Sequence, residues 1–286
     1  MSVTASTPPV VSAEPDGTPR SAKRFDLRED RGLVVTPFIL GLIFVAYWTW
    51  LGTQELSFQA ASALRTDRLV AQTREQLTIT ALSTIGVLLI AIPLGIALTR
   101  PWGKRLAGPV LTVASAGQAI PAYGLLVLAL AILGNVFGRA NDNILQNTLG
   151  VWLGPGLVIT VIALILFAIL PVLRNTMVGL QQVDQDVIEA GLGMGMTRGE
   201  VLRRIELPLA VPVMLAGIRT ALVINVGMAT LAYVIGGGGL GNSIASGIQL
   251  SQNLVVLTAG LITALLALTV DWLGSVAERL LRPKGV

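Results

Sequence analysis

The sequence predicts an all-α fold, a polytopic membrane bundle of about six transmembrane helices with a helical hairpin in one loop. Of the 286 residues, 53% are hydrophobic and only 13% are charged, which is too apolar for a soluble domain of this length. Six stretches approach the length of about 20 apolar residues that a transmembrane helix needs. A polar segment between the fourth and fifth stretches has the pattern of two short helices joined by glycines.

The composition excludes several kinds of chemistry. The chain has no cysteine and no histidine. Disulfides, thiolate catalysis and cysteine-based metal sites are therefore ruled out, and the usual general base and zinc ligand are missing. We expect no catalytic residue, no metal site and no cofactor in this chain. The net charge of +4 would also suit a nucleic-acid binder, but in a membrane protein it more often reflects loop charges.

The predicted spans are bounded by charged residues, glycine or proline. In chain order they are Leu33–Leu51, Leu77–Thr99, Pro109–Leu133, Val151–Leu173, Val211–Ile235 and Leu254–Leu273. The loops between them place fifteen Lys and Arg residues on one side of the membrane and four on the other, with Arg219 near the start of the fifth span. Basic loops stay in the cytoplasm. Both termini and the long fourth loop are therefore predicted to be cytoplasmic.

The fourth loop has the pattern of a helical hairpin. Asp184 and Asp186 suit a helix N-terminus, where carboxylates accept hydrogen bonds from free N–H groups. Gly193 and Gly195 can end this first helix, because glycine adopts the left-handed conformation without penalty. The segment 197–200, Thr-Arg-Gly-Glu, is a capping box, and it starts a second short helix that we expect to end before Pro208.

The same loop carries E-A-G, three residues, G, nine residues and then I-x-L-P. This spacing resembles the signature E-A-A-x3-G-x9-I-x-L-P of ABC-transporter permeases, the cytoplasmic loop that docks on the ATPase. Every position matches except Gly191, where the family usually has Ala; glycine lowers helix propensity by roughly 1 kcal/mol. The resemblance implies coupling to an ATPase through Glu189, Ala190, Gly191, Gly195, Met196, Thr197, Ile205, Leu207 and Pro208. The alternatives are an amphipathic loop on the membrane surface and a DNA-binding helix-turn-helix.

A glycine run follows the fifth span. The segment 236–241 satisfies G-x-G-x-x-G, but a dinucleotide site needs a preceding strand, and an apolar helix precedes this run. It resembles the turn I-G-x-G-G-L-G of the same permeases, which implies a close-packed outer turn at Gly236, Gly238, Gly239 and Gly241, beneath a docked binding protein. A simple glycine linker is the alternative. No phosphate-cradling motif G-x-x-x-x-G-K-[ST] occurs, so ATP and magnesium are expected on a separate ATPase chain.

Few polar residues fall within the predicted spans. Gln118 and Pro121 in the third span, with Asn225 and Gly227 in the fifth, look like the pore-lining segments of the resembled permeases. The alternative is hydrogen bonding that only holds helices together. Arg219 and Asp271 lie near the cytoplasmic ends of their spans, and we expect them to snorkel or to pair.

The resemblance also suggests a domain division. The family core usually has five spans, so 33–75 is predicted to be a peripheral first helix with its outer loop, and 76–275 the permease domain. Residues 1–32, rich in Ser, Thr, Pro and charge, are predicted to form a disordered cytoplasmic tail, and 276–286 a C-terminal cytoplasmic tail. The charged region before Leu33 is too long for an ordinary signal peptide, so we expect the first span to be retained.

The resemblance runs from about Arg74 to Leu273, and the hairpin sequence is most similar to the osmoprotectant branch of these permeases. It implies a MetI-like permease fold and a transport subunit, not an enzyme, that imports glycine betaine, choline or carnitine across the bacterial inner membrane. The implied partners are ABC ATPase subunits, a second permease subunit of the same or a different sequence, an extracytoplasmic binding protein and lipid; none is a nucleic acid. The alternatives are an amino-acid permease, for example for methionine, an ion-coupled secondary transporter and a membrane anchor.

Overall fold

The computed structural model describes residues 31–139 and 155–281, and every regular element within these ranges is a helix. Residues 1–30 of the predicted N-terminal tail and 282–286 of the predicted C-terminal tail lie outside the described residues. The helices are α1 (Arg31–Leu51), α2 (Phe58–Ala63), α3 (Thr66–Thr99), α4 (Lys104–Ala119), α5 (Ala122–Arg139), α7 (Pro155–Gln181), α8 (Gln185–Gly193), α9 (Arg198–Val201), α10 (Leu207–Ala229), α11 (Gly241–Gln249) and α12 (Asn253–Leu281).

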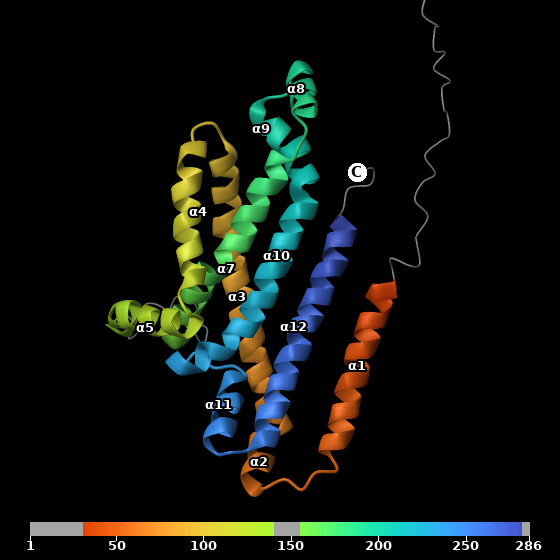
Figure 1. Cartoon of the computed structure of the whole chain (residues 1–286), viewed down its shortest axis with the longest axis vertical. Coiled ribbons are helices and arrows are strands. Elements are labelled where there is room, and N and C mark those ends of the chain that lie inside the picture. Colours follow the sequence, from red (N-terminus) through yellow and green to blue (C-terminus); the bar gives the residue numbers. More distant parts are fainter. Residues whose placement is uncertain (1–30, 140–154, 282–286) are drawn as a thin grey trace, which may run out of the picture.

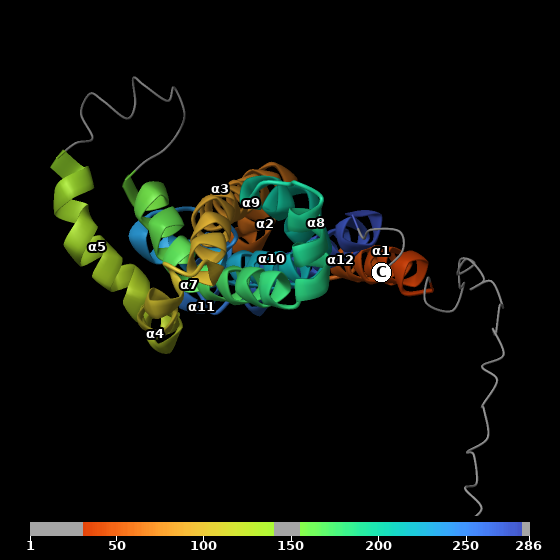
Figure 2. The same cartoon turned by 90° about the horizontal axis from the view of Figure 1, so that it is seen from above.

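The long helices α3, α7, α10 and α12 run roughly side by side and form the body of the molecule (Figure 1). The short helices α8 and α9 lie at one end of this bundle, which we call the hairpin end, and α2 and α11 lie at the other, the glycine-turn end. Seen from above, α1 and α5 lie at opposite edges of the bundle (Figure 2). Helix α1 packs on α12; that this first helix is an addition to the family core stays a prediction.

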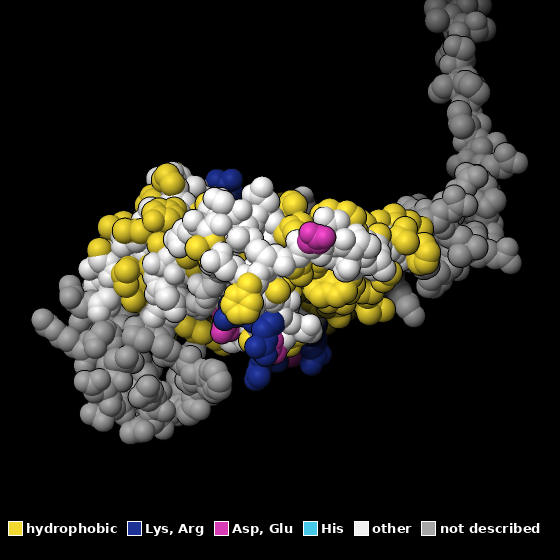
Figure 3. Space-filling view, turned by 90° about the horizontal axis from the view of Figure 1, so that it is seen from below, with side chains coloured by type: hydrophobic (Ala, Val, Ile, Leu, Met, Phe, Trp, Pro, Cys, Tyr) yellow, Lys and Arg dark blue, Asp and Glu magenta, His cyan; other side chains and the backbone are white. Residues whose placement is uncertain are grey.

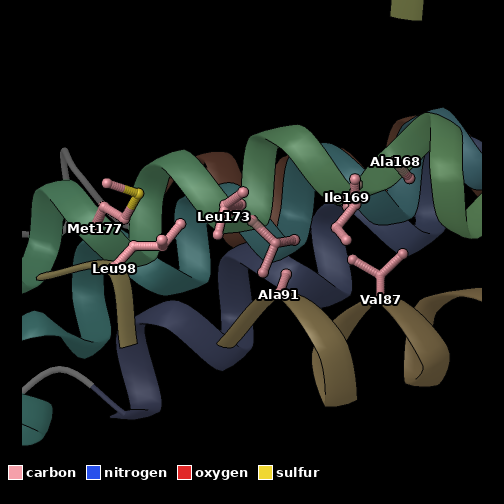
Figure 4. Packing of buried hydrophobic residues seen from close by; sticks show 9 residues of the cluster. Val87, Ala91, Leu98, Ala168, Ile169, Leu173 and Met177 are labelled. Carbon is pink, nitrogen blue, oxygen red and sulfur yellow. The ribbon is translucent and has the colours of Figure 1, made fainter. Parts of the chain in front are cut away.

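The core is built mainly where α3 and α7 pack together. Val87, Ala91 and Leu98 of α3 are buried against Ala168, Ile169, Leu173 and Met177 of α7 (Figure 4). Small residues bring the backbones close, as is typical of helices in membranes. At Gly217 of α10, for example, an added Cβ would lie 2.8 Å from the Pro171 carbonyl oxygen of α7.

The structure supports fewer uninterrupted spans than the six that the sequence predicts. In the part of the chain that the structure describes, four helices are long and apolar enough to cross a membrane, namely Thr66–Thr99, Gly156–Gln181, Arg198–Ile235 and Asn253–Leu281. A fifth crossing requires α4 and α5 to act as one bent span, and the apolar stretch Val35–Leu51 of α1 is shorter. Residues 276–281 of the predicted tail continue α12.

The predicted third span, Pro109–Leu133, is wrong as a continuous helix. Helix α4 ends at Ala119, and α5 leaves it at an angle of 104°. Pro121 has no N–H to donate and disfavours the helical conformation of the residue before it, so Ile120 is extended, with φ −74° and ψ 130°. The apolar composition continues across this break, which explains why hydropathy alone joined the two helices.

The second helix of the hairpin does not end before Pro208, as the sequence predicted. It runs from α9 through a π-helical segment, Leu202–Glu206, directly into α10. The Leu207 N–H donates to the Leu202 carbonyl, five residues earlier. The wider π turn accommodates a proline near the start of α10, where a regular α-turn would meet the proline ring. The hairpin is therefore continuous with the helix that follows it.

Arg219 of α10 and Asp271 of α12 form a bidentate ion pair. The sequence predicted that these residues would either snorkel or pair, and in the structure they pair. The Nη2 atom of Arg219 donates to Asp271 Oδ2 at 2.6 Å, and Nε donates to Oδ1. The side chains are 36% and 34% exposed. The two parallel hydrogen bonds set both the distance and the direction in which the side chains approach each other. The pair therefore fixes the rotation of α10 relative to α12.

Replacing Asp271 with Asn is expected to lower the free energy of unfolding by about 1–2 kcal/mol, less than the loss of a fully buried partner because this pair is partly exposed. Thermal unfolding in detergent, followed by tryptophan fluorescence, measures the change. The matched control is Asp67→Asn, which breaks the local ion pair of Arg65 and Asp67, whose side chains are 68% exposed. Equal losses in the two variants would contradict a structural role for the Arg219–Asp271 pair.

Candidate functional site

The predicted hairpin is present and stands at the end of the bundle (Figure 1). Asp184 caps α8, and its Oδ1 accepts a hydrogen bond from the Asp186 N–H at 2.9 Å. Helix α8 ends at Gly193, and Gly195 has the left-handed φ of +88° that the turn requires. These three features agree with the sequence-based expectation.

The second arm starts with the predicted capping box. The Thr197 N–H donates to Glu200 Oε2 at 2.8 Å, and the Glu200 N–H donates to Thr197 Oγ1 at 3.3 Å. Hydrogen bonds from the backbone and hydroxyl of Thr197 lower the pKa of Glu200 below its ordinary value. The carboxylate is therefore charged at neutral pH. Its negative charge lies at the N-terminal end of α9, where the helix dipole is positive and stabilises it.

The two arms of the hairpin meet at Gly191, which is buried. A Cβ atom added there would lie 2.7 Å from Ile205 Cδ1 and 3.3 Å from Val201 Cγ2. The alanine usual in the resembled family would thus require the Ile205 side chain to move. Gly191 gives up helix propensity, but it allows α8 and the π segment to pack at close range.

The nine predicted coupling residues divide into two groups. Gly191 is buried, and Met196, Ile205 and Leu207 are half-buried where the arms join each other and α10; Glu189, Ala190, Gly195, Thr197 and Pro208 are exposed. The exposed surface of α8 and the turn after it also carries apolar side chains, with Met194 72% exposed and Leu192 and Val187 exposed beside it. Exposed apolar groups around a carboxylate suit contact with another protein.

Glu206 is a site residue that the sequence reasoning missed. It occupies the variable position of I-x-L-P, and its side chain is only 8% exposed. Arg100, directly after α3, donates Nη1 to Glu206 Oε1 at 3.1 Å and Nη2 to Oε2 at 2.5 Å. A carboxylate between apolar residues of a helix was the available signal, because a buried charge needs a partner.

A cavity of about 270 Å³ lies beside this ion pair. Its walls come from α8, the end of α7 and the α3–α4 junction, and they include Arg100, Lys104, Gln181, Gln185 and Glu206. Apolar side chains such as Leu180 and Leu192 line this cavity together with the polar ones. The hairpin is held to the bundle at both of its ends, through the short 182–184 connection from α7 and through α10, and also by the Arg100–Glu206 pair.

The glycine run forms a tight turn at the other end of the bundle. Gly236, Gly238 and Gly239 have positive φ angles of 75°, 86° and 88°, a conformation that glycine adopts without steric cost. A Cβ added to Gly241 would lie 1.8 Å from the Thr230 carbonyl oxygen. Figure 3 views the molecule from this end, where a group of basic side chains with acidic ones beside them interrupts the hydrophobic surface.

Polar residues at the start of α3 hold this turn in place. Glu75 Oε2 accepts from the Gly239 N–H at 2.8 Å, and Gln76 Oε1 accepts from the Leu240 N–H at 3.2 Å. Gln72 Oε1 accepts from the Ser243 hydroxyl at 2.6 Å. The sequence reasoning also missed these residues, although their i, i+3, i+4 spacing places them on one helix face. The geometry is that of a fixed turn, which differs from the alternative of a simple linker.

The four predicted pore residues do not converge on one place within this chain. Gln118 donates to the Phe167 carbonyl of α7 at 3.0 Å, and the fully buried Asn225 donates to Thr84 Oγ1 of α3 at 3.1 Å. These bonds between helices match the alternative of helix-to-helix bonding. Pro121 lies exposed at the α4–α5 bend, and Gly227 is exposed on α10. Their pore-lining role stays a prediction.

Replacing Gly241 with Ala is expected to destabilise the glycine turn by about 1–3 kcal/mol, because its Cβ would overlap the Thr230 carbonyl, which cannot move without the backbone. Gly260→Ala on α12 is the matched control, since no atom lies within 4 Å of its added Cβ. Hydrogen exchange at residues 236–241 measures the change. Slow exchange retained in Gly241→Ala would show that the turn is looser than the structure indicates.

Comparison with known proteins supports the permease resemblance. The chain matches the family described as the binding-protein-dependent transport system inner membrane component over residues 91–283. The choline transport system permease protein OpuBB of Bacillus subtilis is 37% identical over 218 residues, 76% of this chain and 90% of that protein. The carnitine transport permease protein OpuCD of Listeria monocytogenes is 40% identical over 206 residues, 71% of this chain and 82% of that protein.

Solved structures agree on the fold. A chain of the MetNI methionine ABC transporter, in an inward-facing conformation, has a TM-score of 0.60 at 23% identity, covering 75% of this chain and 96% of that one. A chain of a bacterial alginate ABC transporter in complex with a pentasaccharide-bound periplasmic protein has a TM-score of 0.57 at 20% identity, covering 91% and 98%. These likenesses confirm the predicted permease fold. The chain belongs to the family of inner-membrane components, the permeases, of binding-protein-dependent transport systems.

Proposed function

We propose that this chain is the permease subunit of an ATP-driven importer for quaternary ammonium osmoprotectants such as glycine betaine, choline or carnitine. The observation that carries the substrate class is the 34–40% identity to permeases named for choline, carnitine and osmoprotectant transport, across most of their lengths. The alternative of amino-acid transport, for example of methionine, has the support of structural likenesses at 20–23% identity, which concern the fold.

The hairpin is the proposed docking site for a separate ABC ATPase, which would bind ATP and magnesium. Three features support this role: an exposed apolar tip around Glu189, an internal packing point at Gly191 and a continuous helical connection into α10. Closure of an ATPase pair would displace the hairpin, and α10 would turn with it. Rigid-body movement of this kind can alternate access to a pore between two permease subunits.

The proposed orientation places the hairpin end in the cytoplasm and the glycine-turn end outside, in the bacterial inner membrane. The basic residues Arg100, Lys104, Arg198, Arg203 and Arg204 belong to the α3–α4 junction and the hairpin, and this bias favours a cytoplasmic position. At the opposite end, the charged surface of Figure 3 suits an extracytoplasmic binding protein. The second permease subunit would be a copy of this chain or a paralogue.

The docking proposal predicts that Glu189→Ala combined with Met194→Ser will release the ATPase from the purified complex. Both side chains are exposed, so the fold should be unaffected, and loss of a docking centre weakens binding by about tenfold or more. The measurement is recovery, from native membranes in mild detergent, of a protein that hydrolyses ATP and contains a phosphate-binding loop sequence. The matched control at the opposite end is Glu55→Ala with Leu56→Ser. An ATPase retained equally by both variants would argue against docking at the hairpin.

The substrate proposal predicts uptake of labelled glycine betaine, choline or carnitine when the chain and its partner subunits are expressed in a host without such transporters. Unlabelled quaternary amines should compete for uptake, and methionine should not. The control is the same host with the Glu189→Ala, Met194→Ser permease. Competition by methionine, with no uptake of any quaternary amine, would transfer the assignment to amino-acid import.

A further inference from the structure

We infer that α3 is a second transmission helix, joined to the coupling hairpin by the positioning residues Arg100 and Glu206. Displacement of the hairpin would then move α3 together with α10, not α10 alone. This inference rests on the proposed function, since it describes how movement of the hairpin reaches the membrane helices.

At the hairpin end, an ion pair joins the end of α3 to the segment that leads into α10. Arg100 and Glu206 are 106 residues apart in the sequence, and their ion pair is bidentate. Two parallel N–H···O bonds between planar groups fix the direction of approach as well as the distance. Since the Glu206 side chain is only 8% exposed, water is a poor substitute for Arg100, and separation of the pair would leave a buried charge.

Helices α3 and α10 are also joined along their lengths. The Asn225 amide of α10 donates to Thr84 Oγ1 of α3 at 3.1 Å. Closer to the glycine turn, Gln76 Nε2 donates to the Val226 carbonyl at 2.8 Å, and Gln76 has no exposed surface. Polar groups in an apolar bundle have few other partners, so these bonds resist sliding of one helix along the other.

At the glycine-turn end, α3 is also bonded to the glycine turn. Gln76 Oε1 and Glu75 Oε2 accept hydrogen bonds from the backbone of the turn that follows α10. Helix α3 is thus attached to both signature elements, the hairpin at one end and the turn at the other. The hairpin and the glycine turn are thus connected twice: through the chain of α10, and through α3 by polar contacts at both of its ends.

The inference predicts that Glu206→Gln will uncouple the transporter without stopping it. In proteoliposomes of the complete complex, ATP hydrolysis should stay near the wild-type rate, while solute imported per ATP falls by at least about fivefold, within the usual range of coupling between sites. Arg105→Gln, which changes an exposed basic residue close to Arg100 in sequence, is the control and should keep the wild-type ratio. A wild-type ratio in Glu206→Gln would overturn the inference.

Rescue variants distinguish a role of Arg100 and Glu206 in positioning α3 from a role in the stability of the fold alone. The exchanged pair Arg100→Glu with Glu206→Arg should recover part of the ratio. The chain has no cysteine of its own, so Arg100→Cys with Glu206→Cys can be joined by a flexible bifunctional thiol reagent. Because the pair is inferred to stay together throughout the cycle, crosslinking should raise solute imported per ATP towards the wild-type value. Loss of transport on crosslinking would overturn the inference by showing that the two residues must separate.

Failure of the proposed function and failure of a variant to assemble can both be told apart from failure of this inference. If the wild-type complex contains no ATPase or imports no quaternary amine, the proposed function fails before the variants are compared. If the Glu206→Gln complex does not assemble, the inference is tested with the crosslinked cysteine pair alone, because its covalent link replaces the ion pair. A ratio near the wild-type value in that variant supports the inference, and a low ratio contradicts it.

Discussion

The structure depends on one constraint: a long polar side chain that enters an apolar helix bundle needs a hydrogen-bond partner, and in this bundle four such side chains find it outside their own helix. Packing of α3 against α7 buries much of the core, but such packing is weakly directional. Direction comes from the polar contacts of Gln76, Asn225, Glu206 and Arg219, each of which is made to a residue outside its own helix. Three of these four residues belong to α10 or to the π segment that leads into it. Helix α10 is therefore the element whose rotation is most fully specified.

The hairpin combines this fixed attachment with an exposed tip. Its two arms close on Gly191, and a capping box and a glycine turn set its shape. The π segment keeps the second arm continuous with α10 despite Pro208. A force applied at Met194 or Glu189 therefore reaches α10 through the second arm and reaches the end of α3 through the Arg100–Glu206 pair, while α8 itself follows α7 after the short 182–184 connection.

The sequence predicted the features that are encoded locally. Asp184, Gly195 and the Thr197–Glu200 box gave the correct hairpin, because each acts on backbone groups a few residues away. The interruption at Pro121 was missed because apolar composition continues across it. The partners of Glu206 and Gln76 also could not be named, since Arg100 and the glycine turn come close only when α3 and α10 pack together. For Glu206 the signal in the sequence was a lone acidic residue among apolar ones, and for Gln76 it was a polar helix face. Both signals indicate that a partner exists, but not where in the fold it lies.

The most direct test of the account is the distance between the end of α3 and the hairpin during the transport cycle. Spin labels at Trp102→Cys, in the turn after α3, and Met194→Cys, both on exposed positions, can be measured by pulsed electron paramagnetic resonance in the assembled transporter. The account predicts that the distance between the two labels within one subunit is the same without nucleotide and with ATP bound, because the hairpin and α3 move as one body. A shift of several ångströms on ATP binding would contradict it.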